Sequence, residues 1–300
     1  MGKTATLKPQ RALGCTCGRE ARLDHGIPME DSPRLVDISG YLSQPSEAEI
    51  ECARLFRPHE QLVIFDIGAC EGEDSIRYAR HYPRSRVFAF EPLPANQALV
   101  RANLERYAAR NATLYPVALS DRAGDATFHV SSGRPRDLFA GENWNYGNKS
   151  SSLLPPAQNE PMHGWIEFKE SITVRTETLD EFCRTHAIAR IDFIHMDVQG
   201  AEHLVLNGAQ TMLPRVTAIW LEVSECALYR CQKTRPEIED LMHRHRFALG
   251  FELRREIEGD QLFLNTRHLR PWGYFAGSYA RAMLRRARSV AGRAKHALHR

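Results

Sequence analysis

The chain has 300 residues, of which 43% are hydrophobic and 26% are charged, so wholesale disorder is excluded. No apolar run reaches the roughly 18 residues that a membrane-spanning helix needs. The first residues contain no apolar signal core, and the seven cysteines are too scattered for a disulfide framework. We therefore expect a cytoplasmic protein built as one large domain or two small ones.

The net charge of +3 hides an uneven distribution. Nine of the 40 Lys and Arg residues follow Asp260 and no acidic residue does, which leaves 31 basic against 37 acidic residues in 1–260. This acidic body argues against nucleic acid as a partner, because nucleic-acid-binding domains usually carry a basic stripe. The basic end, 277–300, fits either a solvated terminus or a weak contact with an anionic membrane surface.

Apolar runs and turn signals predict strands and helices that alternate along most of the chain. Strands buried on both faces are predicted over 62–68, 86–92, 112–121, 191–198 and 216–223, and shorter strands over 126–130 and 171–176. Helices are predicted over 46–57, 72–82, 94–110, 201–213 and 236–247. Ser46 with Glu49, and Thr178 with Glu181 at a further short helix, predict capped starts. Residues 248–265 predict a closing hairpin that turns at 258–260.

This order of elements predicts a doubly wound α/β fold with a mostly parallel sheet and a terminal antiparallel hairpin. We assign an irregular extension to 1–45, one domain to 46–276 and a basic tail to 277–300. Within the domain, 131–170 is rich in Gly, Asn, Ser and Pro and forms a long insertion. Loops of that length in a compact domain are usually functional or disordered, and we expect this one to bind a ligand.

Glycines and acids follow the first two predicted strands, where ligands of open α/β sheets bind. Gly68 and Gly72 would let the backbone turn tightly and approach a ligand. Their spacing is not GxGxxG, and neighbouring acids such as Asp66 would repel a dinucleotide diphosphate, which argues against an NAD-dependent oxidoreductase. Glu91, 19 residues beyond Gly72, is placed to accept hydrogen bonds from ribose hydroxyls. These residues favour a cofactor that is cationic, carries a ribose and has no phosphate. S-adenosylmethionine has these three properties.

Six segments in chain order resemble the FkbM-type methyltransferases over about residues 60–265: FDIGACEGEDS (65–75), VFAFEPLPANQALVRANL (87–104), VALSDRAGDATF (117–128), SSSLLP (150–155), IDFIHMDVQGAEHLVLNGA (191–209) and LEVSECALY (221–229). The resemblance implies a class I S-adenosylmethionine-dependent O-methyltransferase that acts on a sugar, a glycan or a polyketide-type natural product. It also implies a seven-stranded sheet in the order 3-2-1-4-5-7-6, with the seventh strand antiparallel.

The same resemblance assigns cofactor contacts to individual residues. It places Asp66, Gly68 and Gly72 at the methionine end, Glu91 at the ribose, and Val117, Ala118 and Asp121 in the adenine pocket, where Asp121 would accept from the exocyclic amine. The chain departs from the family at His195, where Lys is frequent, and at Gln199, where an acid is common. Both departures leave the cofactor site intact and the identity of the catalytic base open.

His195 and Asp197 stand two apart at the end of a predicted strand, so their side chains point to the same side. We predict a catalytic pair in which His195 accepts a proton and Asp197 orients it or the acceptor hydroxyl, although His195 could equally be a satisfied sheet histidine. Together with Glu222 they could instead hold Mg²⁺ through waters, so a Mg-dependent O-methyltransferase stays an alternative. No other metal site is predicted, because Cys15 and Cys17 lack the second pair of a zinc signature.

The insertion supplies most of the predicted acceptor contacts. Its aromatic side chains stand among Asn and Ser, a mixture that suits a sugar or polyketide through stacking and hydrogen bonds. We predict that Trp144, Tyr146, Ser151 and Glu222 bind a small-molecule or glycan acceptor and that the insertion does not govern the cofactor. A catalytically silent methyltransferase fold is the rival to an enzyme, and the intact set of cofactor residues argues against it. The sequence leaves the oligomeric state open.

Overall fold

The structure is a computed structural model that describes residues 37–133, 146–157 and 164–268. The first part contains α1 (Ser39–Leu42), α2 (Glu47–Leu55), β1 (Val63–Ile67), α3 (Glu73–His81), β2 (Arg86–Phe90), α4 (Pro94–Arg106) and β3 (Ala112–Tyr115). The middle contains β4 (Ala118–Leu119), β5 (Gly124–Gly133), the 3-10 helix η1 (Tyr146–Ser150) and β6 (Ile166–Glu177). The last part contains α6 (Leu179–Thr185), β7 (Ile191–Met196), α7 (Glu202–Asn207), the 3-10 helix η2 (Leu213–Arg215), β8 (Val216–Ser224), α8 (Arg235–Arg244), β9 (Phe247–Arg254) and β10 (Glu258–Asn265).

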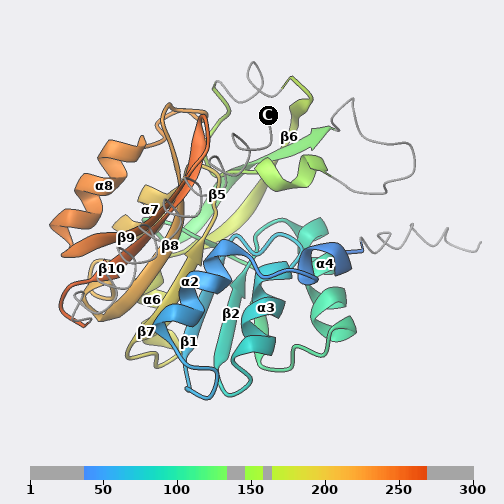
Figure 1. The fold of residues 1–300 in the computed structure, drawn as a ribbon. Coiled ribbons are helices and arrows are strands. Elements are labelled where there is room, and N and C mark those ends of the chain that lie inside the picture. Colours follow the sequence, from blue (N-terminus) through green and yellow to red (C-terminus); the bar gives the residue numbers. More distant parts are fainter. Residues whose placement is uncertain (1–36, 134–145, 158–163, 269–300) are drawn as a thin grey trace, which may run out of the picture. The chain divides into compact units, whose positions relative to one another are not determined.

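The main sheet has seven strands in the order β3-β2-β1-β7-β8-β10-β9 (Figure 1). β10 is antiparallel to β8 and β9, whereas the pairs from β3 across to β8 are parallel. Numbered along the chain, this is the expected order 3-2-1-4-5-7-6, so the predicted doubly wound fold is confirmed. The winding reverses between β1 and β7, and ligands of such sheets bind at that point, beyond the carboxyl ends of the strands.

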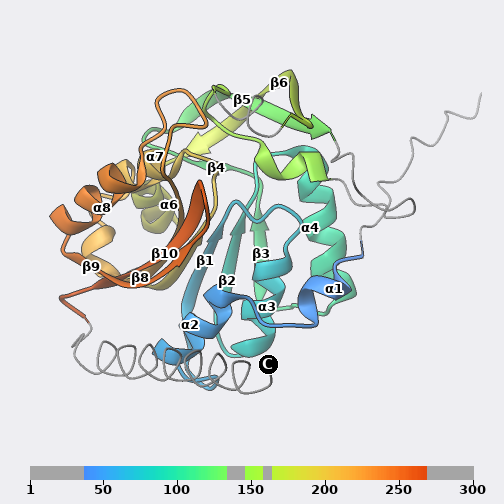
Figure 2. The same ribbon diagram turned by 45° about the horizontal axis from the view of Figure 1, so that its top comes forward.

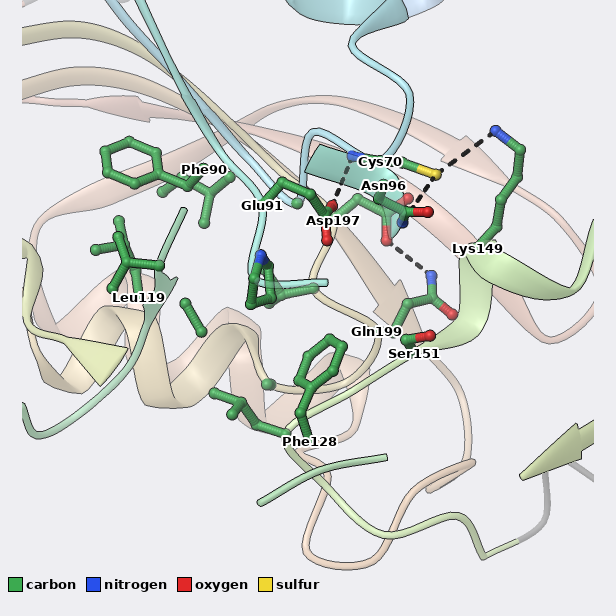
Figure 3. A pocket seen from close by; sticks show the side chains of 18 of the residues that line it. Cys70, Phe90, Glu91, Asn96, Leu119, Phe128, Lys149, Ser151, Asp197 and Gln199 are labelled. Atoms are coloured by element: carbon green, nitrogen blue, oxygen red, sulfur yellow. Dashed lines mark hydrogen bonds between the residues drawn. The ribbon is translucent and has the colours of Figure 1, made fainter. Parts of the chain in front are cut away.

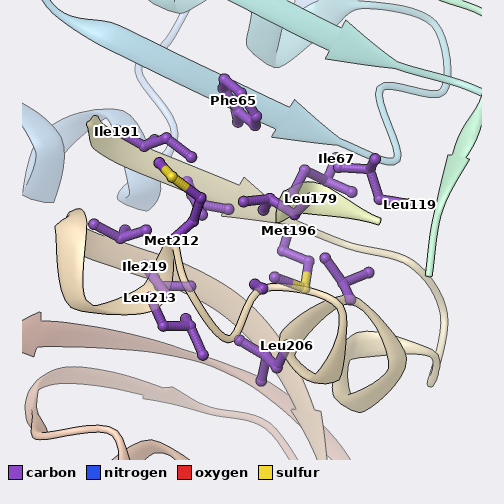
Figure 4. Close-up of a cluster of buried hydrophobic side chains, with 14 of the residues drawn as sticks. Phe65, Ile67, Leu119, Leu179, Ile191, Met196, Leu206, Met212, Leu213 and Ile219 are labelled. Atoms are coloured by element: carbon purple, nitrogen blue, oxygen red, sulfur yellow. The ribbon is translucent and has the colours of Figure 1, made fainter. Parts of the chain in front are cut away.

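Helices cover both faces of this sheet (Figure 2). On one face α6, α7 and α8 pack against side chains that include Phe65, Met196 and Ile219 (Figure 4). On the other face α2 and α3 pack against side chains that include Ile64 and Phe193. Successive strand residues point to opposite faces, so burial of both faces explains why the central strands read as continuous apolar runs.

A second sheet of three strands, β4-β6-β5, corrects the predicted strand over 112–121. That run divides at Pro116, which has no backbone N–H to donate to a strand neighbour. The chain turns there, with Val117 N–H donating to the Tyr115 carbonyl over 2.9 Å. β3 therefore joins the main sheet and β4 the second one. The second sheet also takes up both ends of the predicted insertion, since β5 reaches Gly133 and β6 begins at Ile166.

Several element boundaries differ from those predicted. The helix expected over 201–213 ends at Asn207, and its C-cap is Gly208, where a Cβ would lie 2.0 Å from the Ser120 carbonyl oxygen. The closing hairpin turns over 255–257, since 258–260 already pair with β8. Part of the extension assigned to 1–45 is ordered as α1, preceded by the fully buried Ile38. No helix in the described ranges combines the length and apolar content needed to cross a membrane.

Both predicted helix caps are confirmed, and they allow a stability test. Ser46 accepts from Glu49 N–H, and Thr178 accepts from Glu181 N–H over 3.1 Å. Replacing Thr178 by Ala leaves that N–H without its acceptor and should lower the free energy of unfolding by about 1 kcal/mol. Chemical denaturation measures the loss, with Thr211→Ala, an exposed threonine, as the control. An equal loss in both variants would contradict the capping role.

Candidate active site

A first cavity opens at the carboxyl ends of β1, β2 and β7 (Figure 3). It comprises about 540 Å³, counting the part open to solvent. One end has the apolar side chains Phe90, Val117, Ala118, Leu119 and Phe128, and the other end has Gly68, Cys70, Lys149 and Asp197. Cofactor sites are typically concave, mostly apolar and equipped with a few placed polar groups. The cavity therefore has the character of a cofactor site.

Glu91 is the acidic side chain between these two ends. Its carboxylate accepts from the backbone N–H of Cys70 over 2.9 Å and from that of Leu93 over 2.8 Å. Burial raises the pKa of Glu91 to about 8, although these two hydrogen bonds act to lower it. Since each carboxylate oxygen can accept more than one hydrogen bond, the group can still receive hydroxyl donors from a ligand. Glu91, Val117 and Ala118, which the sequence assigns to the ribose and the adenine, thus line one cavity.

The two glycines of the first turn differ in role. Gly68 lines the cavity at φ +91°, and a Cβ there would lie 1.8 Å from the Asp197 carbonyl oxygen. The close approach of the β1 and β7 ends therefore requires glycine. Gly72 also has a positive φ, but it precedes α3 and faces Val100, outside the lining of this cavity. The predicted contact of Gly72 with the methionine end of the cofactor therefore stays a prediction, and Gly72 does not line this cavity.

Two more predicted cofactor residues lie outside this lining. Asp66 is buried on the other side of β1, where it accepts from the Ser75 hydroxyl and faces a second cavity. Burial raises the pKa of Asp66 to about 7, against the opposing effect of His195. Asp121 is half-buried at the end of β4 and contacts Ser120 and Arg122. The sequence placed both residues in a single cofactor site because it could not show which face each strand end presents.

The insertion contributes to the first cavity, whereas the sequence predicts that it governs the acceptor and not the cofactor. Asn148, Lys149, Ser151 and Leu153 line this cavity. The Asn148 amide donates to the Asn96 side chain over 3.0 Å, and Lys149 Nζ lies 3.1 Å from a Glu73 carboxylate oxygen. Trp144 lies outside the described residues, and of Tyr146 only its backbone, at the start of η1, is described.

A second and larger cavity, about 1340 Å³ counting its open part, adjoins the first. The two share Gly68, Cys70, Lys149 and Asp197. Its walls come from α1, α2 and α3 and from the ends of β1, β7, β8 and the β9–β10 hairpin. Two predicted catalytic residues, His195 and Asp197, line it together with the predicted acceptor residue Glu222. Ser151, in contrast, lines the first cavity and not this one.

His195 projects from β7 toward α3. Its Nδ1 lies 3.1 Å from the Tyr78 hydroxyl and 3.8 Å from an Asp74 carboxylate oxygen. Burial alone would lower the pKa of His195, but the carboxylates of Asp74, Asp66 and Asp197 outweigh it and raise the pKa above its usual value. A proton on Nδ1 is favoured beside Asp74, which leaves Nε2 with the lone pair.

Gln199 contacts two acids of the second cavity, Asp197 and Glu222. Its side-chain amide donates to Asp197 over 2.7 Å and to Glu222 over 3.0 Å, and its oxygen accepts from the Tyr229 hydroxyl over 3.2 Å. Burial raises the pKa of Glu222 well above its usual value, and the charge of Asp197 adds to this. Gln199 adopts a positive φ of 53° in the turn after β7. Asp197 is thus oriented by Gln199, whereas Tyr78 and Asp74 orient His195.

The alternative magnesium site gains no support from this geometry. Among the described residues, no three His, Cys, Asp or Glu side chains gather in a way that could hold a metal ion. In place of a cation, the Gln199 amide bridges Asp197 and Glu222.

The fold and the first cavity together define a class I S-adenosylmethionine-dependent methyltransferase. The donor set fits that cofactor: two carboxylates and one lysine border the cavity, and the buried Asn148 amide oxygen has no hydrogen-bond partner among the described residues. Residues 66–252 match the Methyltransferase FkbM domain. The chain belongs to the FkbM family of methyltransferases and is an enzyme of that kind.

Two sequence relatives agree with this assignment, and one solved structure is similar to part of the chain. The chain is 36% identical over 208 residues to the 2-O-methyltransferase NoeI of Sinorhizobium fredii (strain NBRC 101917 / NGR234), which covers 68% of this chain and 80% of the relative. It is 28% identical over 176 residues to the 31-O-demethyl-FK506 methyltransferase FkbM of Streptomyces tacrolimicus, and the alignment covers 54% of this chain and 65% of that relative. A solved methyltransferase FkbM from Methylobacillus flagellatus KT aligns with a TM-score of 0.44 and 14% identity, over 70% of this chain and 45% of that one.

Proposed function

We propose that this enzyme transfers a methyl group from S-adenosylmethionine to a hydroxyl oxygen of a sugar, a glycan or a polyketide-type natural product. The observation that carries the proposal is the shared wall of the two cavities at Gly68, Cys70, Lys149 and Asp197. A donor in the first cavity and an acceptor in the second would meet there. The names of the relatives, a 2-O-methyltransferase and a 31-O-demethyl-FK506 methyltransferase, support oxygen as the atom that is methylated.

The first cavity would hold the cofactor along its length. Glu91 would accept hydrogen bonds from the ribose, and Val117 and Ala118 would border the adenine. Asn148 and Lys149 would contact the amino and carboxylate groups of the methionine part. When bound, the cofactor supplies a methyl group made electrophilic by the sulfonium, so the enzyme needs to orient the acceptor and remove a proton.

His195 would take that proton on Nε2, since Tyr78 and Asp74 face its Nδ1. Asp197, fixed by Gln199, would accept a hydrogen bond from a neighbouring hydroxyl of the acceptor and so orient the reacting oxygen at the junction of the cavities. In this proposal His195 is the base and Asp197 orients the acceptor. We place the reaction in the cytoplasm, as the cysteine pattern of the sequence suggests.

Replacing Glu91 by Ala tests the donor site. The change leaves the ribose hydroxyls without their acceptor and should weaken binding of S-adenosylmethionine by about 1–3 kcal/mol, roughly 5- to 150-fold in Kd. Isothermal titration calorimetry with S-adenosylmethionine and S-adenosylhomocysteine measures the change. Glu105→Ala, an exposed glutamate of α4, is the matched control. Wild-type affinity in the Glu91 variant would contradict the proposed cofactor site.

A further inference from the structure

The second cavity is completed by parts of the chain outside the 66–252 family match. Tyr41, Ser46, Glu47 and Ala48 come from the segment before β1, and Leu253, Arg255 and Asp260 from the hairpin at the other end. Residues shared with the family thus form the donor side, whereas segments that flank the matched domain close the acceptor side. Such segments are suited to set which acceptor is taken.

Tyr41 is the aromatic side chain at the rim of this cavity. It is 42% exposed, and Lys149 Nζ lies 5.6 Å from the centre of its ring. Arg77 fixes this segment to α3, because its guanidinium donates to the Tyr41 carbonyl and, over 3.4 Å, to the Gln44 carbonyl. An aromatic ring held in place beside polar groups is the arrangement that packs against the apolar face of a sugar ring.

Acidic side chains outnumber basic ones in the lining of the second cavity. Seven acidic side chains line it against three basic ones, and His195. Each basic side chain is paired: Arg77 with Asp74 at 2.9 Å, Lys149 with Glu73 at 3.1 Å, and Arg255 with Asp260 at 3.1 Å. These pairs leave the acids Glu47, Asp66, Asp197 and Glu222. Burial raises the pKa of Asp66 to about 7 and that of Glu222 well above its usual value, so the remaining negative charge lies mainly on Glu47 and Asp197. Besides the three paired cations, His195 is the group of this lining that can carry a positive charge, and it lies beside Asp74, so an anionic ligand would meet a repulsion that grows as water is excluded.

We propose, resting on the proposed function, that the second cavity binds a glycosyl acceptor and selects uncharged or amine-bearing sugars against anionic ones. Tyr41 packs on the sugar ring, and the carboxyl groups of Glu222 and Asp260 accept hydrogen bonds from its hydroxyls. Trp220, which is buried and stacked on Phe251, also lines this cavity. Vicinal hydroxyls donate well to carboxylates, which accept through both oxygens.

Methyl transfer to a panel of p-nitrophenyl pyranosides tests the selection. The panel holds matched gluco, galacto, fuco and rhamno sugars, glucosaminides and glucuronides, and product is read as S-adenosylhomocysteine release and a mass gain of one methyl group. We expect kcat/KM for uncharged and amine-bearing members to exceed that for uronides by at least about tenfold. Asp260→Asn frees Arg255 and should reduce this discrimination by about fivefold. Asp125→Asn, on the exposed part of β5, should not change it.

Tyr41 is tested with the sugar that the wild type methylates best. Tyr41→Ala should raise its KM about tenfold, while kcat and the Kd for S-adenosylhomocysteine stay within about twofold. Tyr41→Phe, which keeps the ring, should behave as the wild type. The unchanged cofactor Kd shows that each variant is folded.

The outcomes separate the two proposals. Equal turnover of uronides, or wild-type KM in Tyr41→Ala, overturns the assignment of the acceptor site and leaves O-methyl transfer standing. Methylation of a polyketide alcohol with no turnover of any pyranoside does the same. Absence of methylation on every alcohol, with cofactor binding intact, overturns the proposed function and this inference with it.

Discussion

Replacing His195 by Ala should lower kcat about 10²- to 10⁴-fold, while the Kd for S-adenosylhomocysteine changes by less than about twofold. The imidazole lines the acceptor cavity and not the donor cavity, so its loss should affect the transition state and spare the cofactor. Single-turnover rates at saturating cofactor and acceptor measure the effect. His186→Ala, a histidine at the end of α6 that packs on Tyr115, controls for removal of an imidazole elsewhere.

The pH dependence gives a second readout of the same role. Because the base must be neutral, the rate should rise with pH and level off above the pKa of His195, which its neighbouring carboxylates hold above about 6.5. Asp74 is the strongest of these carboxylates, so Asp74→Asn should lower that pKa and move the inflection to lower pH. A residue with a purely structural role would change the rate without moving the inflection.

Two results would remove His195 from the mechanism. One is wild-type kcat in His195→Ala, which would leave catalysis to positioning by Asp197. The other is loss of turnover in EDTA with recovery in Mg²⁺, which would favour the metal alternative that the sequence left open. Asp197→Asn should also lose activity, and the double variant should be little worse than the poorer single one, since residues that act together are not additive.

The fold could be predicted well because its signals are local. Buried strands have continuous apolar runs. Each helix cap depends on two residues only three positions apart, Ser46 with Glu49 and Thr178 with Glu181. The errors arose where a contact distant in sequence decides the structure. The split at Pro116 was visible as a residue, but the pairing of β4 with β6 depends on positions more than 50 residues away.

The candidate site divides in the same way. Glu91, Gly68 and the pair His195 and Asp197 were predicted because each stands at a strand end, and the topology brings strand ends together. Asn148, Lys149 and Tyr41 were missed because only the fold carries η1 and α1 to these cavities. The SSSLLP segment that follows Lys149 could have indicated that this part of the insertion returns to the site. Gly72 and Asp121, which the sequence also assigned to the cofactor, do not line the first cavity, because residues near one another in sequence can face different sides.

The two glycines of the first turn should respond very differently to the same substitution. Gly68→Ala forces a Cβ to within 1.8 Å of the Asp197 carbonyl oxygen, so the ends of β1 and β7 have to separate. We expect a loss of more than about 3 kcal/mol in the free energy of unfolding, together with at least about 100-fold weaker cofactor binding, since Gly68 and Asp197 form the shared wall. Thermal denaturation and calorimetry with S-adenosylhomocysteine measure both.

Gly72→Ala is the matched variant, because Gly72 also has a positive φ, of +83°, but its Cβ would meet only Val100, at an ordinary 3.4 Å. It should cost about 1 kcal/mol for the left-handed backbone and leave cofactor affinity within about threefold. Gly124→Ala, at φ +139° with open space around it, isolates the backbone cost away from the site. Weaker cofactor binding in the Gly72 variant than in the Gly68 variant would support the predicted contact of Gly72 with the methionine end of the cofactor. It would also mean that the cofactor lies deeper in the first turn than the wall shared by the two cavities.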